Sequence, residues 1–122
     1  MRRFVVSEMS MSPALMPGDR FVARRLRKPE RGRIVFFPHP HRPDFWLVKR
    51  IAGIPGDAVR FLDGEPVVEA EAEAPDAVLV PAGYMYVLSD RPDLTRADSR
   101  TFGPVPTRPA YLAVFRYRRG DR

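Results

Sequence analysis

The residues with the clearest capacity for chemistry are one serine, Ser10, and one lysine, Lys49. A serine hydroxyl becomes a good nucleophile only when a base removes its proton, and a lysine can be that base only if its amine is neutral. Of the 21 basic residues only Lys28 and Lys49 are lysine, so arginine supplies the ordinary positive charge. Because arginine does not lose its proton in proteins, a lysine in this background indicates a site where deprotonation matters.

The segment around Lys49 predicts a strand that buries this side chain. Side chains alternate between the two faces of a strand, so Lys49 shares a face with Phe45, Leu47 and Ile51, while Arg50 points the other way. Apolar surroundings disfavour the charged form of a lysine and lower its pKa. From the pattern alone both interpretations stay open, a buried base at Lys49 and a lysine that merely extends from a strand into solvent.

Ser10 and Lys49 each begin a segment rich in turn residues. These segments are 10–19 and 49–57, a third is 97–106, and an apolar run at 32–36 lies between the first two. In this order they resemble the signature boxes of the signal peptidase I family, and together they cover most of the chain. The resemblance implies a serine endopeptidase in which Ser10 is the nucleophile and Lys49 the general base. Such an enzyme removes N-terminal signal or leader peptides and uses no cofactor.

The same resemblance implies supporting roles for further residues. Ser10 sits at the end of the first strand, and its own N–H is one donor to the oxyanion of the reaction. Asp98, Ser99 and Arg100 support the site, whereas the alternative for Asp98 and Arg100 is a surface ion pair of little energetic value. Ser12 competes with Ser10 on sequence grounds, but the family's nucleophile is followed directly by a methionine, as Ser10 is.

The resemblance also places the substrate as an extended strand beside residues 5–6 and 47–48. A peptide added to a sheet edge is held by main-chain hydrogen bonds and selected through alternate side chains. We expect small substrate side chains to enter shallow pockets, and a plain core role is the alternative for the lining residues. The predicted substrate-binding residues are Val6, Met11, Leu15, Leu47 and Val48.

Two positions depart from the family's pattern. Glu8 stands two residues before Ser10, where the family has a serine or glycine, and we expect its carboxylate to point outward. Arg96, with Thr95 beside it, occupies the place of a serine that hydrogen-bonds the lysine. The sequence therefore identifies neither the second oxyanion donor nor the partner that orients Lys49.

The two histidines, His39 and His41, lie in a proline-rich loop with Asp44. They offer two alternatives, a metal site or a serine triad that includes Asp44. Two ligands are too few for a metal site, and a triad histidine needs a rigid frame. Both alternatives therefore rank below the pair Ser10 and Lys49, and no metal is predicted.

The spacing of turn residues along the chain indicates its fold class. Fourteen prolines and eight glycines separate short apolar runs, which favours strands joined by tight turns. Asp63-Gly64 predicts a two-residue hairpin turn, and alternate residues from Tyr111 to Tyr117 are expected on one face. We expect a mainly β fold of antiparallel strands, a partly closed barrel with little helix, in which 69–74 is a brief helix or a mobile loop. The predicted strands are 4–6, 21–25, 33–37, 45–51, 58–62, 65–68, 77–80, 84–88 and 110–117.

The 122 residues are predicted to form a single catalytic domain, 1–122. The chain has no cysteine, which excludes a thiol nucleophile and thiolate metal sites. Its net charge of +6 is scattered and no nucleic-acid motif accompanies it, so no nucleic-acid partner is expected. No apolar run approaches the ~20 residues of a membrane helix. We therefore expect a cytoplasmic or peripherally membrane-associated protein.

Other functions remain open on the sequence alone. One is a maturation protease for a specific protein such as nickel superoxide dismutase, since short members of the resembled family include such enzymes. Another, of a different class, is a catalytically silent peptide-binding module, which Glu8 and Arg96 allow and the presence of both Ser10 and Lys49 opposes. A LexA-type self-cleaving regulator shares the serine–lysine chemistry but needs an upstream DNA-binding domain, and only nine residues precede Ser10.

Overall fold

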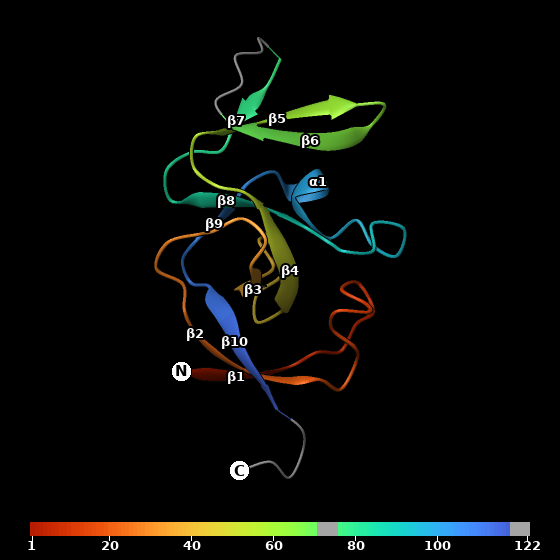
Figure 1. Ribbon diagram of the computed structural model, residues 1–122, viewed down its shortest axis with the longest axis vertical. Coiled ribbons are helices and arrows are strands. Elements are labelled where there is room, and N and C mark those ends of the chain that lie inside the picture. Colours follow the sequence, from red (N-terminus) through yellow and green to blue (C-terminus); the bar gives the residue numbers. More distant parts are fainter. Residues whose placement is uncertain (71–75, 118–122) are drawn as a thin grey trace.

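The computed structural model describes residues 1–70 and 76–117, and strands dominate it (Figure 1). All the strand pairs are antiparallel, so the predicted mainly β class is confirmed. The elements are β1 (Arg2–Val5), β2 (Arg20–Arg25), β3 (Ile34–Pro38), β4 (Trp46–Gly53), β5 (Asp57–Leu62), β6 (Glu65–Ala70), β7 (Val78–Leu79), β8 (Tyr84–Leu88), α1 (Ser99–Phe102), β9 (Val105–Pro106) and β10 (Tyr111–Tyr117).

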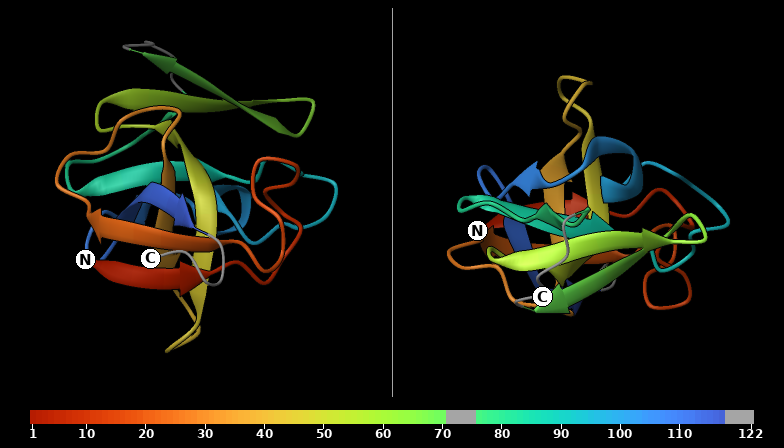
Figure 2. Two further views of the ribbon diagram at one scale, coloured as in Figure 1. Left: turned by 60° about the horizontal axis from the view of Figure 1, so that its bottom comes forward. Right: turned by 90° about the horizontal axis from the view of Figure 1, so that it is seen from above.

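The strands form two sheets that lie one above the other along the long axis of the molecule (Figures 1 and 2). The larger sheet has seven strands in the order β1-β2-β10-β3-β4-β8-β9, and the smaller has three in the order β6-β5-β7. The larger sheet is coiled, and β1 and β9 are its edge strands. In the part of the chain described here, no helix is both long and apolar enough to cross a membrane.

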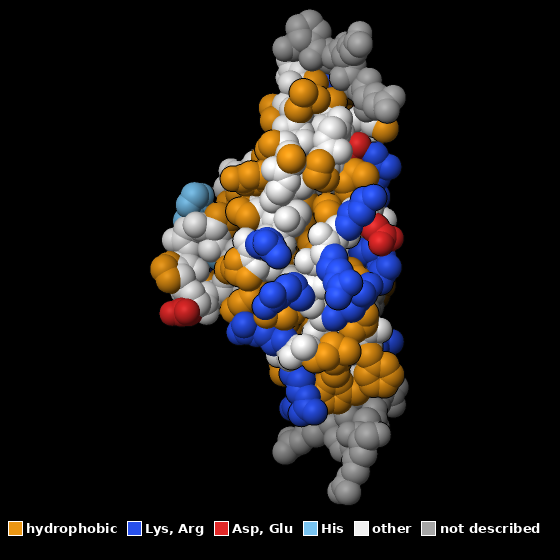
Figure 3. Space-filling model, turned by 90° about the vertical axis from the view of Figure 1, so that its left-hand side faces the viewer, with side chains coloured by type: hydrophobic (Ala, Val, Ile, Leu, Met, Phe, Trp, Pro, Cys, Tyr) orange, Lys and Arg blue, Asp and Glu red, His pale blue; other side chains and the backbone are white. Residues whose placement is uncertain are grey.

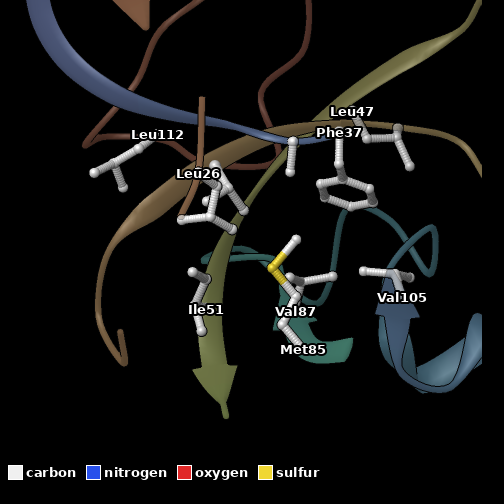
Figure 4. Close-up of a cluster of buried hydrophobic side chains, with 10 residues drawn as sticks. Leu26, Phe37, Leu47, Ile51, Met85, Val87, Val105 and Leu112 are labelled. Carbon is white, nitrogen blue, oxygen red and sulfur yellow. The ribbon is translucent and has the colours of Figure 1, made fainter. Parts of the chain in front are cut away.

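β4 has the alternation that the sequence predicts. Leu47, Lys49 and Ile51 are buried, and Arg50 lies half-buried on the opposite face. The main apolar cluster packs on the Lys49 side of β4 and draws on strands from across the larger sheet (Figure 4). Its buried members are Leu26, Val35, Phe37, Leu47, Ile51, Met85, Val87, Val105, Ala110 and Leu112.

The structure differs from the predicted elements where short or irregular backbone is involved. β9 and α1 were not expected, because two and four residues are too few to show a period in the sequence. A β-bulge between Ala113 and Phe115 breaks the expected one-face alternation of β10. β6 continues to Ala70, so the start of the segment predicted as helix or loop is strand, and residues 71–74 of it lie outside the described residues.

The predicted hairpin turn is confirmed between β5 and β6. Asp63 and Gly64 have φ values of 51° and 79°, and the strands on either side are paired from Leu62↔Glu65 outward. Two successive positive φ values are what a type I′ turn requires.

The two sheets meet where β4 passes Gly53. A Cβ atom added at Gly53 would lie 3.0 Å from Cβ of Tyr86 and 3.3 Å from Cγ1 of Val68. Tyr86 belongs, with Val59 and Val80, to a buried cluster shared by strands of both sheets and the segment that follows β7. Close packing, not a positive φ, therefore requires glycine at this position.

Gly53→Ala is predicted to destabilise the protein. The added methyl would overpack the junction of the sheets, which costs about 1–3 kcal/mol of unfolding free energy. Urea unfolding followed by circular dichroism would measure this loss as a lower midpoint. Ala82→Ser in an exposed turn is the control and should leave the midpoint unchanged. A Gly53→Ala protein as stable as the parent would show that the junction can relax.

Candidate active site

The side chains of Ser10 and Lys49 meet inside the larger sheet. The distance between Lys49 Nζ and Ser10 Oγ is 3.1 Å, within hydrogen-bond range. Lys49 is 0% exposed and Ser10 is 3% exposed. The structure thus places the two predicted residues within direct reach of each other, as a nucleophile and its base must be.

Ser10 lies in the loop between β1 and β2, so the expected position at the end of the first strand is wrong. β1 ends at Val5, and Ser10 occupies a turn in which Ser12 N donates to Met9 O at 3.0 Å. The base of the loop is closed by Gly18 N, which donates to the carbonyl of Val6 at 2.7 Å. The turn carries the Ser10 hydroxyl away from the sheet edge and into the interior, where Lys49 is buried.

Burial is the largest influence on the pKa of Lys49, and it lowers this pKa. The carboxylates of Glu8 and Asp98 act in the opposite direction, and the guanidinium of Arg100 lowers the pKa further. The net shift is downward, which favours the neutral amine that a base needs. Glu8 is exposed, as expected, but its charge still reaches Lys49.

Asp98 and Arg100 form a buried ion pair, not the weak surface pair considered as an alternative. Asp98 Oδ1 accepts from Arg100 Nε at 2.9 Å, and the two side chains are 0% and 3% exposed. Burial alone would raise the pKa of Asp98, but hydrogen bonds from Arg100 and from the backbone N–H of Ser89 outweigh it and lower the pKa. Arg100 also donates to the carbonyls of Pro92 and Thr95. The pair therefore fixes the loop between β8 and α1.

Ser99, the third predicted support residue, contributes a backbone contact. Its Oγ accepts from Val87 N at 2.9 Å, which ties the start of α1 to β8. Ser99 is buried and has no hydrogen bond to Lys49 among the residues described.

A segment that the sequence did not indicate, residues 89–91, links the two halves of the site. Ser89 N donates to Asp98 Oδ2 at 3.0 Å, and Arg91 N donates to the carbonyl of Ser10 at 2.9 Å. Asp90 accepts two hydrogen bonds from Arg50, at 2.9 and 2.7 Å. The available sequence signal was a polar Ser-Asp pair directly after the apolar strand β8.

A small cavity of about 50 Å³ lies between residues 4–8 and 46–48, the stretches that precede Ser10 and Lys49 in the chain. Val6, Leu47 and Val48 line it, together with Glu8 and aromatic side chains. The remaining predicted substrate-binding residues, Met11 and Leu15, do not line the cavity and belong to the buried cluster that includes Val6. The structure thus brings three of the five predicted residues to one cavity.

The histidines lie apart from the serine. The His39 ring packs on Phe102 with 4.7 Å between ring centroids, and His39 Nδ1 accepts from His41 N at 3.0 Å. Across residues 1–70 and 76–117 no hydrogen bond joins either histidine to Ser10, and no group of three or more potential metal-ligating side chains occurs. This geometry does not assemble the serine triad considered above.

Comparison with known proteins gives one family. The family model described as "Signal peptidase, peptidase S26" matches residues 1–111. The mitochondrial ATP-independent inner membrane protease subunit 1b of Arabidopsis thaliana is 36% identical over 102 residues, which cover 80% of this chain and 57% of that protein. The probable thylakoidal processing peptidase 2 of the same plant is 33% identical over 135 residues, which cover 92% of this chain and 36% of that protein. The chain thus spans 57% and 36% of the lengths of these two relatives.

A solved structure has the same fold. The crystal structure of a signal peptidase I from Enterococcus faecalis superposes with a TM-score of 0.56 at 23% sequence identity. The match covers 74% of this chain and 99% of that one.

Because the Lys49 amine is buried, its removal is predicted to stabilise the folded protein. The unfolded chain holds Lys49 at an ordinary lysine pKa of about 10.4, whereas the folded protein holds it lower. Between these two values the unfolded state binds more protons, so stability rises with pH. Lys49→Met removes this penalty and should raise the melting temperature near pH 7, with a gain that shrinks as the pH approaches 10.4.

Melting temperatures measured by circular dichroism from pH 7 to pH 10 would check this. Lys28→Met is the matched control, because Lys28 is exposed and its replacement should leave the melting temperature unchanged. A Lys49→Met protein that is less stable than the parent at pH 7 would contradict the prediction that the Lys49 amine destabilises the folded state.

Proposed function

The chain belongs to the signal peptidase, peptidase S26 family, and on this premise we propose that it is a serine endopeptidase that removes N-terminal signal or leader peptides. The observation that carries the proposal is the fully buried Lys49 amine, 3.1 Å from the hydroxyl of Ser10. A peptide-binding module without catalysis would have no need to bury a lysine against a serine. The similarity to an inner membrane protease and to a thylakoidal processing peptidase supports the same reaction class.

In the proposed reaction the neutral amine of Lys49 accepts the proton of Ser10 as Oγ attacks the scissile carbonyl carbon. The oxyanion that forms is within reach of the Ser10 backbone N–H, which donates no hydrogen bond within the described residues. The Lys49 ammonium then gives its proton to the leaving amine, and an ester with Ser10 remains. Lys49 next accepts a proton from the water that attacks this ester and returns it to Ser10 Oγ as the ester bond breaks, which restores the free serine and the neutral amine.

The free strand edges beside the cavity suit an extended peptide. β1 is an edge strand, and β4 pairs with β8 only from Arg50 onward, so the earlier part of β4 has no partner on that side among the described strands. The cavity lies between these stretches, lined by residues 4–8 and 46–48. A substrate strand placed there gains main-chain hydrogen bonds, and the small volume favours a small side chain such as alanine.

Substitution of the two central residues tests the mechanism. Ser10→Ala should abolish cleavage of leader-bearing precursors, while Ser12→Ala should keep most of it. Lys49→Arg should be as inactive as Lys49→Ala, with losses on the order of a thousandfold or more, because arginine cannot become neutral. In the parent protein kcat/KM should rise as the pH increases through the lowered pKa of Lys49.

Cleavage would be followed by mass-spectrometric identification of new N-termini in a mixture of leader-bearing precursors. Lys28→Arg is the matched control and should be fully active, because Lys28 is exposed and outside the site. Wild-type cleavage by a folded Ser10→Ala or Lys49→Arg protein would refute the assigned roles.

We also propose that the outer face of β1, β2 and β10 rests on a membrane surface. Directly opposite residues in this sheet are Arg3, Val22 and Phe115 in one row and Val5, Arg20 and Tyr117 in another, so each row shares a side. Val5 and Phe115 are 57% and 61% exposed. Figure 3 shows Lys and Arg side chains interspersed with hydrophobic ones over one side of the molecule, including its lower end. Such a mixture of apolar and basic groups favours an anionic lipid surface.

Vesicle sedimentation tests this contact. The protein should bind vesicles that contain phosphatidylglycerol and phosphatidylcholine more tightly than vesicles of phosphatidylcholine alone, and added salt should weaken binding. The double variant Val5→Ser, Phe115→Ser should bind less. The control Phe61→Ser, Leu79→Ser removes comparably exposed side chains from the smaller sheet and should bind as the parent does. Equal binding by both double variants would exclude this face.

A further inference from the structure

Ser89 carries a buried hydroxyl that has no hydrogen-bond partner within the described residues. The residue is 8% exposed, and it directly follows β8. Buried polar side-chain atoms are nearly always hydrogen-bonded, so an unpartnered one calls for an explanation. Neither the family resemblance nor the predicted site includes Ser89.

The register of β4 against β8, continued one residue beyond its last pair, places Ser89 opposite Lys49. In the ladder between β4 and β8, Ile51 is opposite Val87 and Arg50 is opposite Leu88. One step further along the same ladder, Lys49 comes opposite Ser89. Directly opposite residues of antiparallel strands point to the same side. Alternation agrees, because Val87 belongs to the core cluster on the Lys49 face and Ser89 is two residues further on.

The backbone around Ser89 is fixed to both halves of the site. Its N–H donates to the buried carboxylate of Asp98 at 3.0 Å. Two residues later, Arg91 N donates to the carbonyl of Ser10 at 2.9 Å, and between them Asp90 N donates to Met11 Sδ at 3.4 Å. The Ser89 side chain is therefore held on a backbone that is bonded to the nucleophile's loop.

The other hydroxyls near the site are already engaged or face elsewhere. Ser99 Oγ accepts from Val87 N, and Thr95 Oγ1 accepts from Ala97 N at 3.0 Å. Arg96, at the place of the family's lysine-orienting serine, is exposed. Tyr86 also has an unpartnered hydroxyl, but its side chain packs in the cluster between the two sheets, on the other face of β8. Ser12 Oγ accepts from Arg91 Nη1 at 3.4 Å, so among the described residues Ser89 is left as the hydroxyl available to Lys49.

We propose that Ser89 is the positioning residue of the base, whose Oγ accepts a hydrogen bond from Lys49 Nζ. A neutral amine has two N–H donors and one lone pair. When Ser89 accepts one of these N–H groups, rotation of the amine is restricted and its lone pair is directed at Ser10 Oγ. The inference rests on the proposed function of the Ser10 and Lys49 pair and extends it to a third residue.

The proposal has a signature in the titration of Lys49. The ammonium form also donates to Ser89, so loss of the hydroxyl removes an acceptor that favours the charged form. The pKa of Lys49 should then fall below its value in the parent protein. The charged groups that act on Lys49, namely Glu8, Asp98 and Arg100, are the same in both proteins.

Ser89→Ala, with Ser89→Thr as the rescue variant, is the test. In Ser89→Ala we expect kcat to fall by up to about a hundredfold with little change in KM, because only the geometry of proton transfer is lost. Ser89→Thr keeps the hydroxyl and should recover most of the activity. Thr107→Ala removes an exposed hydroxyl that bonds to the carbonyl of Gly83, and it should behave as the parent does.

The second readout needs no substrate. The chain has only two lysines, so labelling at the lysine ε-carbon gives two NMR signals, with exposed Lys28 as the reference for buried Lys49. Titration should show a lower pKa of Lys49 in Ser89→Ala and recovery in Ser89→Thr. An unchanged Lys49 titration in Ser89→Ala overturns the proposal, whether or not kcat falls. If instead Ser10→Ala still cleaves, the proposed function is wrong. The titration then still shows separately whether Lys49 donates a hydrogen bond to Ser89.

Discussion

The proposed active site depends on one lysine amine that is kept out of water. The apolar side chains beside Lys49 on β4 exclude solvent from its amine. In the described residues the Ser10 hydroxyl, at 3.1 Å, is the one hydrogen-bond partner of this amine. Burial disfavours the ammonium form, which weakens the folded state and at the same time favours the neutral amine that the proposed reaction needs. Stability and reactivity therefore oppose each other at this residue. The rest of the fold has to supply the stability that Lys49 removes.

The surrounding charges are arranged so that burial decides the protonation state of Lys49. Asp98 would raise the pKa of Lys49 and Arg100 would lower it, but the two are paired with each other, so their effects oppose. The same pair fixes the loop that carries Ser89 and contacts the Ser10 loop. The buried pair of Asp98 and Arg100 thus limits the net electrostatic effect on Lys49 and fixes the position of the loop, without direct contact with Ser10 Oγ or Lys49 Nζ.

The surroundings of Lys49 were predictable because a face assignment within a strand depends only on close neighbours such as Leu47 and Ile51. The β class followed from turn residues, and the family resemblance, drawn from segments in a fixed order, is confirmed by the family match. Features that depend on contacts between distant segments were not predictable. Ser89 is a single serine in the sequence, and only the pairing of β8 with β4 shows what it faces. The turn at Ser10 likewise depends on packing against residues 89–91.

The unpaired edge of β1 has a consequence for self-association. Open strand edges invite the same strand of another molecule, and long apolar ones lead to aggregation. β1 has only four residues, and two of them are Arg2 and Arg3. The guanidinium of Arg2 lies 4.4 Å from the centroid of the Trp46 ring, so positive charge is held beside the edge. Two copies of this chain, each with a net charge of +6, repel each other there, which opposes pairing of one β1 edge with another and favours the single extended peptide of the proposed function.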